Sequence, residues 1–210
     1  NVKDASGAYT LSGENTFALS YLYHYFKFEE SEDAAAVDST GHTNGAKKNV
    51  QVVEGVDGNA IYVNGNGYVD VSSKVLSEHN EFTISTWVKW AGGSDSDNCI
   101  ISNDISGDGG SRGLTYKISK GRFMVTSNIG GIESEVNVPV DEWVHLAMVK
   151  DAENVTLYMN GEVVAQKENP FDMANQDTNF RIGGNMDGSG GLVGAFKGAI
   201  DEVLIYTAAL

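Results

Sequence analysis

The chain has 210 residues, of which 41% are hydrophobic and 20% charged, so a sizeable core is available and disorder is not expected. Its 29 acidic residues outweigh 14 basic ones and give a net charge of -15, which argues against nucleic acid and anionic membrane surfaces as partners. The single cysteine, Cys99, excludes an internal disulfide and is expected to be a buried, inert thiol. No run approaches the roughly 20 apolar residues of a membrane span, so no membrane insertion is expected.

Short segments rich in β-branched and aromatic residues follow one another along the chain, separated by Gly, Asn and Asp. The first strand is expected at 21–30, and the Asn160-Gly161 pair predicts a tight hairpin between two later strands. Further strands are expected at 50–53, 60–63, 68–71, 82–90, 99–102, 113–118, 122–127, 132–136, 143–150, 155–159, 162–166, 180–182 and 196–210.

This pattern predicts an all-β protein. Many short strands, 25 glycines, no amphipathic helix and no linker favour a single domain over residues 1–210, built as a two-sheet antiparallel β-sandwich. Residues 1–20 alternate only weakly and are expected to form an extra edge strand or a tail.

Two carboxylates stand out against apolar strand faces. Counting by two along the last strand places Asp201 on one face with Val203 and Ile205, and Glu30 ends the apolar row of the first strand. An uncompensated buried charge is very costly, so each carboxylate needs a partner.

A set of motifs, in fixed order, points to a family. They read FKFEE, DSTGHTNG (38–45), GNAIYVNGNGYVDV (58–71), FTISTWVKW (82–90), EWVHLAMVKD (142–151), VTLYMNGEVV (155–164), FRIGG (180–184) and FKGAIDEVLIY (196–206). In these residues the chain resembles the laminin-G-like, concanavalin A-like lectin domains, in particular their bacterial lectin-type branch. The resemblance implies a jelly roll whose first and last strands are adjacent.

The resemblance also implies a structural calcium where the loop after the first strand meets the last strand. The ligands it implies are Glu30, Asp38, the Gly41 carbonyl, Asn44 and Asp201. Calcium takes six to eight oxygen ligands, a number that carboxylates, carbonyls and water supply together.

Two points leave the calcium site open. The family tends to have a small residue where this chain has His42 and Thr43, so the carbonyl that would serve is not fixed. Alternatively, Asp38 caps a local turn and Asp201 accepts backbone N–H groups, with no metal involved.

Glycine-rich loops and nearby polar residues suggest a sugar site. A sugar ring has apolar faces and a rim of hydroxyls, so it is bound by an aromatic platform together with planar polar side chains. The candidates are Trp90, Asn103, Asp104, Arg112, Tyr116, Asn128 and Asn185. Core packing is the alternative for Trp90 and Tyr116, and it is the expectation for Trp87 and Trp143.

Catalysis is not expected. Jelly-roll glycosidases place acids as E-x-D-x-E on one strand face, and no such motif occurs in the sequence. The four histidines show no metal-ligand spacing and are expected to be structural.

These observations predict a non-catalytic carbohydrate-binding module for polysaccharide or oligosaccharide, with calcium as scaffold. We expect a monomeric module of a larger extracellular glycosidase or surface protein, located outside the cell or on its surface. The alternative is an adhesion or protein-interaction domain of the laminin-G type.

Overall fold

The computed structural model describes most of the chain. The described residues are 2–3, 9–10, 21–93, 97–106, 113–127, 130–168 and 178–210. Near the N-terminus, β1 (Val2–Lys3) pairs with β2 (Tyr9–Thr10) as a separate two-stranded sheet, so these four residues add no strand to the main sheet.

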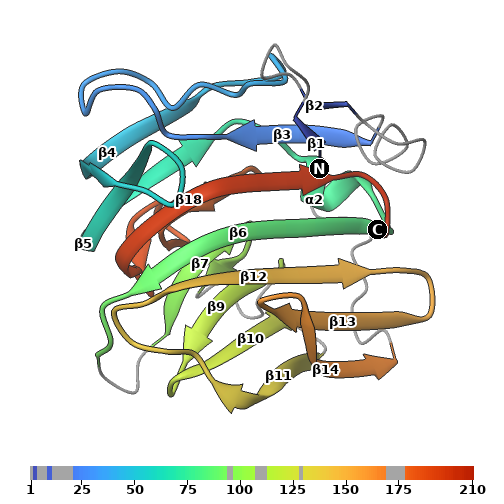
Figure 1. The fold of residues 1–210 in the computed structure, drawn as a ribbon. Helices are drawn as coiled ribbons and strands as arrows, with labels where there is room; N and C mark the ends of the chain where they lie inside the picture. Colours follow the sequence, from blue (N-terminus) through green and yellow to red (C-terminus); the bar gives the residue numbers. More distant parts are fainter. Residues whose placement is uncertain are drawn as a thin grey trace.

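Two layers of antiparallel strands form the body of the molecule (Figure 1). The front layer contains β3 (Leu22–Phe26), β18 (Lys197–Tyr206), β6 (Phe82–Trp90), β12 (Trp143–Lys150), β13 (Asn154–Met159) and β14 (Glu162–Glu168). The back layer contains β15 (Phe180–Ile182), β7 (Asn98–Ser102), β9 (Thr115–Ser119), β10 (Arg122–Ser127) and β11 (Gly130–Asn137). The predicted all-β sandwich is confirmed.

The strand β5 (Asn59–Val71) joins the two layers, and β4 (Gly45–Glu54) pairs along it. Residues 61–64 of β5 pair with β18 in the front layer, whereas residues 69–71 pair with β15 in the back layer. The crossing needs glycine, because Gly65 has a φ of 75° and a Cβ at Gly67 would overlap the backbone oxygen of Asn49.

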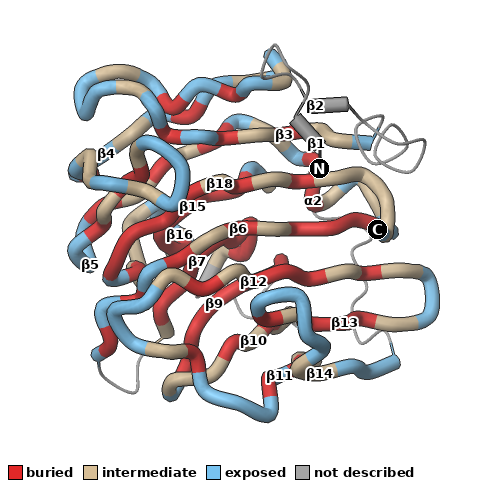
Figure 2. The backbone as a smooth tube through the Cα atoms, in the orientation of Figure 1, coloured by how far each residue is buried: buried red, intermediate tan, exposed pale blue. Residues whose placement is uncertain are grey.

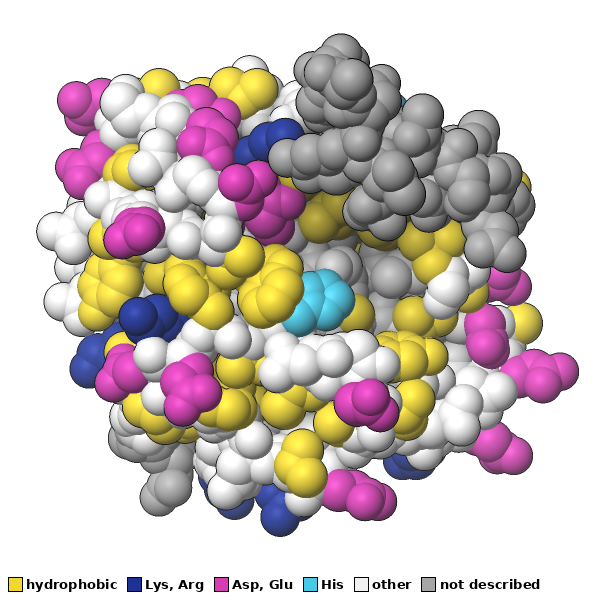
Figure 3. Space-filling view, in the orientation of Figure 1, with side chains coloured by type: hydrophobic (Ala, Val, Ile, Leu, Met, Phe, Trp, Pro, Cys, Tyr) yellow, Lys and Arg dark blue, Asp and Glu magenta, His cyan; other side chains and the backbone are white. Residues whose placement is uncertain are grey.

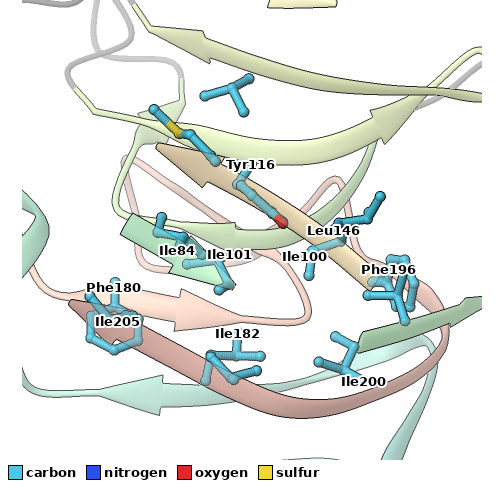
Figure 4. Close-up of a cluster of buried hydrophobic side chains, with 14 of the residues drawn as sticks. Ile84, Ile100, Ile101, Tyr116, Leu146, Phe180, Ile182, Phe196, Ile200 and Ile205 are labelled. Atoms are coloured by element: carbon cyan, nitrogen blue, oxygen red, sulfur yellow. The ribbon is translucent and has the colours of Figure 1, made fainter. Parts of the chain in front are cut away.

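The hydrophobic core fills the space between the layers, and exposed residues gather at the loops (Figure 2). Tyr116 lies among Ile100, Ile101 and Leu146, well inside the cluster of buried side chains (Figure 4). The predicted hairpin is also confirmed: Asn160 and Gly161 have φ values of 51° and 84° and connect β13 to β14.

A smaller sheet brings two distant loops together. Its middle strand β16 (Asn185–Asp187) pairs in parallel with β8 (Ile105–Ser106) and antiparallel with β17 (Leu192–Val193). The segment after β7 therefore lies beside the segment after β15. One short helix, α2 (Val75–Glu78), follows β5.

The last strand departs from its predicted pattern at Glu202. Between Asp201 and Leu204 the strand advances three residues while its partner β6 advances two, and Glu202 has a φ of 49°. This β-bulge reverses the alternation, so Val203 faces the core whereas Asp201 points to the other side. The expectation that Asp201 shares a face with Val203 is therefore wrong.

Candidate functional site

Both oxygens of the Asp38 carboxylate accept hydrogen bonds. Oδ1 accepts from the backbone N–H of Tyr25 at 3.0 Å and from the N–H and hydroxyl of Thr40 at 3.1 and 2.7 Å. Oδ2 accepts from the N–H of Thr43 at 3.2 Å and lies 2.7 Å from Nδ1 of His24. Burial alone would raise the pKa of Asp38, but these hydrogen bonds outweigh it and lower the pKa to about 2.

The Asp201 carboxylate is fully buried under the turn between β4 and β5. Its Oδ2 accepts from the N–H of Val56 at 2.8 Å and of Asp57 at 3.5 Å, and its Oδ1 accepts from the N–H of Glu202 at 2.8 Å. Burial raises its pKa to about 6, and the three N–H groups offset only part of that shift. Backbone amides therefore supply the partner that the sequence required.

The other predicted calcium ligands have different partners. Asn44 Oδ1 accepts the N–H of Asp38 at 3.0 Å, the Gly41 N–H donates to the Asp38 carbonyl at 2.9 Å, and Glu30 Oε2 lies 3.9 Å from Lys47 Nζ. Within the described residues, no group of three or more Asp, Glu, His or Cys side chains could hold a metal ion.

As these residues lie, they do not fit a calcium ion, because Asp38 and Asp201 are directed at the N–H groups of two separate loops. The hydrogen-bonding alternative accounts for both carboxylates. Calcium binding stays a prediction.

Ser73, His24 and Asp38 form a hydrogen-bonded chain in the order found in serine hydrolases. His24 Nε2 lies 2.8 Å from Ser73 Oγ, and burial lowers the pKa of His24 although Asp38 opposes that shift, so the neutral ring can donate to Asp38 and accept from Ser73. The His24 ring is completely buried, however, and Ser73 Oγ also accepts from the N–H of Val75 at 3.4 Å. We interpret the chain as a clamp that joins β3 to the segment before α2.

The structure decides between the two roles left open for Trp90 and Tyr116, and it differs from the expectation for Trp87 and Trp143. Trp90 is 5% exposed and Tyr116 is completely buried against Phe123, so core packing holds for both and neither forms a sugar platform. Trp87 and Trp143, expected in the core, are partly exposed on the outer side of the front layer. Along β6, the inward positions belong to Val88 and Trp90, and strand alternation then turns Trp87 outward.

The remaining described candidates lie around the small sheet. Ser102 donates its hydroxyl to Asn185 Oδ1 at 2.9 Å and accepts the N–H of Asp104 at 3.1 Å, while Asn185 Nδ2 donates to Asp104 Oδ2 at 3.2 Å. Asn103 Oδ1 accepts the N–H of Leu114 at 2.7 Å, which joins the backbone at residue 114 to the end of β7. Arg112 and Asn128 lie outside the described residues.

Asp104 and Asn185 open onto a hollow of about 600 Å³ on the outer side of the back layer. We call it the back-layer hollow. Its lining includes the polar side chains of Asp97, Asp104, Lys117, Thr126, Asn185 and Lys197. A hydrogen-bonded polar wall and a size suited to a small ligand make it a candidate binding site.

Opposite charges lie close together in the back-layer hollow. Lys117 Nζ forms an ion pair with Asp97 Oδ2 at 2.7 Å, and Lys197 is exposed. Cys99 lines the same hollow and is buried, as expected, and this burial raises the pKa of its thiol to about 12, which favours an inert thiol.

Asp97, Lys117 and Lys197 were not predicted as site residues from the sequence. Lys117 stands between Tyr116 and Ile118, so its position opposite to two core residues was a usable signal for an outward polar side chain. Lys197 carried no signal, because only the folded chain brings Gly92, Gly93 and Asp97 beside the start of β18.

The family model for the concanavalin A-like lectin/glucanases superfamily, of laminin-G type, matches residues 63–210. This chain belongs to that superfamily. A search of curated proteins gave no match. No helix among the described residues is long and apolar enough to cross a membrane.

Solved structures of similar fold include domain 4 of AbnA, an extracellular GH43 arabinanase from Geobacillus stearothermophilus, in complex with arabinotriose. It has a TM-score of 0.67 and 21% identity over 90% of this chain and 94% of that one. The CBM40 of the Ruminococcus gnavus IT-sialidase, bound to α2,3 sialyllactose, has a TM-score of 0.63 and 17% identity over 72% and 91%. A Trypanosoma rangeli sialidase with sialic acid has a TM-score of 0.68 and 14% identity over 91% of this chain but 31% of the enzyme. At these identities the likeness shows the fold.

Proposed function

We propose that this chain is a non-catalytic carbohydrate-binding module and that its ligand, an oligosaccharide or a segment of polysaccharide, occupies the back-layer hollow. The observation that carries the proposal is the fixed polar wall of that hollow. Ser102, Asn185 and Asp104 hold one another in place, so their orientation costs little side-chain entropy when a ligand binds.

The comparisons support the ligand class. Two neighbours that match most of their own length are an arabinanase domain in complex with arabinotriose and a carbohydrate-binding module bound to sialyllactose. In this proposal the module acts outside the cell as part of a larger glycosidase or surface protein. A structural calcium is a separate prediction and is not needed for the proposed contacts.

The test is calorimetric titration with arabinotriose, with soluble arabinan and with sialyllactose, alongside a wider glycan array. Asp97→Ala and Lys197→Ala change two charged residues of the hollow, and Lys27→Ala, an exposed lysine on the other layer, is the control. We expect at least a tenfold loss of affinity in the first two variants and none in the control. Absence of binding to every glycan by the unmodified protein would reject the proposal.

A further inference from the structure

A second hollow, of about 470 Å³, lies on the outer side of the front layer. We call it the front-layer hollow. Its lining includes Glu54, Tyr62, Lys89, Asp141, Trp143 and Ala199. Nothing in the sequence pattern singled out this place, because Trp143 was expected to be a core residue.

Four of these residues form one row across four neighbouring strands. Ala199 on β18 pairs with Tyr62 on β5 and with Lys89 on β6, and Lys89 pairs with Trp143 on β12. Directly paired residues project from the same side of a sheet, so the order across the row is Tyr62, Ala199, Lys89 and Trp143. Three strand spacings separate its ends by about 14 Å.

The two ends of the row are aromatic and partly exposed. Tyr62 and Trp143 both line the front-layer hollow, while Ala199, a residue only 4% exposed, forms part of its floor. Next to Tyr62 the small Ala199 leaves the row open, whereas the exposed Lys89 stands between Ala199 and Trp143. Hydrophobic side chains form a band across this face of the molecule (Figure 3).

Charged groups surround the rings. Lys89, Glu54 and Asp141 are exposed, and no ion pair joins Lys89 to another residue in the described part of the chain. Two carboxylates against one ammonium leave a negative excess, which disfavours an anionic ligand. Aromatic faces with hydrogen-bonding groups beside them match the apolar faces and hydroxyl rim of a neutral sugar.

We propose that the front-layer hollow is a second binding site, specific for a neutral glycan chain, in which Tyr62 and Trp143 stack on two different sugar units. Three strand spacings, about 14 Å, separate the two residues, so each ring is assigned its own sugar unit. The ligand class rests on the proposed function, but the site consists of other residues and is tested separately.

The two hollows open near the same end of the sandwich. Lys197 lines the back-layer hollow and Ala199 lines the front-layer hollow, two residues apart on β18, while Gly92 and Ala91 are adjacent members of the two linings. A long glycan chain can therefore contact both sites. A trisaccharide fills only one of them, so the contribution of Trp143 should grow with chain length.

The experiment measures binding of soluble arabinan, soluble xylan, arabinotriose and sialyllactose to the unmodified protein and to Trp143→Ala and Tyr62→Ala. Tyr158→Ala, which removes another partly exposed aromatic ring from the front layer, is the matched control. Titration calorimetry gives the affinity, and a melting curve shows that each variant is folded. Tyr62 and Trp143 lie on different strands. If one of the two variants fails to fold, the other still tests the site.

We expect both variants to weaken binding of a neutral polysaccharide at least tenfold, with unchanged binding of sialyllactose and no effect of Tyr158→Ala. If a neutral polysaccharide binds both variants as tightly as the unmodified protein while Lys197→Ala weakens it, the second site is rejected and the proposed function stands. If the variants change only self-association in sedimentation, the face is an interface between copies and the second site is likewise rejected. If no glycan binds the unmodified protein, both proposals fail.

Discussion

Asp38 and Asp201 are both buried carboxylates. Asp38 accepts a hydrogen bond from β3, and Asp201 belongs to β18, the neighbouring strand of the front layer. Their pKa values nevertheless shift in opposite directions. Asp38 is bound by five donors, which include a side-chain hydroxyl and an imidazole. Asp201 is bound by three backbone N–H groups, one of them at 3.5 Å. Burial alone therefore does not fix the charge of a carboxylate, because the number and quality of its hydrogen-bond donors decide it.

The largest expected effect is that of Asp38→Ala, because the change leaves several buried donors unpaired. We expect the free energy of unfolding to fall by about 3 to 5 kcal/mol. Asp187→Ala is the control: it removes a carboxylate that accepts from Ser189 and Gly191 in a more exposed turn, and it should cost about 1 kcal/mol. Urea unfolding measures both. Equal losses would show that the Asp38 donors find other partners.

Asp201 should make the protein less stable as pH rises. Its pKa is about 6 when folded, against an ordinary 3.8, so between these values the folded state keeps a proton that the unfolded state has released. Stability should therefore fall by about 3 kcal/mol from about pH 4 to about pH 6. The urea unfolding midpoint should depend less steeply on pH in Asp201→Asn than in the unmodified protein. An identical pH dependence in the two proteins would assign the effect to another group.

Asp38 contributes the opposite pH dependence. Its folded pKa of about 2 lies below the ordinary 3.8, so its stabilisation is complete above about pH 4 and is lost as the pH falls through about 2. Acid unfolding of the unmodified protein and of Asp38→Asn should differ in that range. Acid-unfolding curves that superimpose for the two proteins would contradict the low pKa of Asp38.

The clamp gives a smaller prediction. Ser73→Ala removes one hydrogen bond to His24 and should cost about 1 kcal/mol in urea unfolding. A structural clamp also predicts that a fluorophosphonate probe leaves Ser73 unlabelled. Covalent labelling at Ser73, absent in Ser73→Ala, would instead show a reactive hydroxyl.

Chelation gives the smallest expected effect. If hydrogen bonds alone compensate the buried carboxylates of Asp38 and Asp201, EDTA should leave the Tm at neutral pH unchanged. The calcium prediction from the sequence requires a marked fall that added calcium reverses. A scanning melting curve of the metal-free protein, with magnesium as a control, separates the two.

The candidate site was predictable in part. Asp104 and Asn185 were identified from polar residues in long loops, and they do meet at the back-layer hollow. Trp90 and Tyr116 were chosen as platforms and proved to be core residues, because an aromatic side chain beside a glycine loop fits either role until its strand register is known. The row of Tyr62, Lys89 and Trp143 comes from three strands far apart in the chain, so no local pattern marks it.

What the sequence determined by itself is local: the strands, the Asn160-Gly161 turn and the ordered motifs of the superfamily. These depend on side-chain alternation and on turn residues, which act over a few positions. Which side of each strand is buried depends on how the strands pack together. The bulge at Glu202 reverses the side-chain alternation of the last strand. The glycines of β5 allow that strand to pass from one layer to the other. Pairing with β12 leaves Trp87 on the outer side of the front layer. Each depends on what lies opposite, because the register of neighbouring strands, and not the period of one strand, sets its buried face.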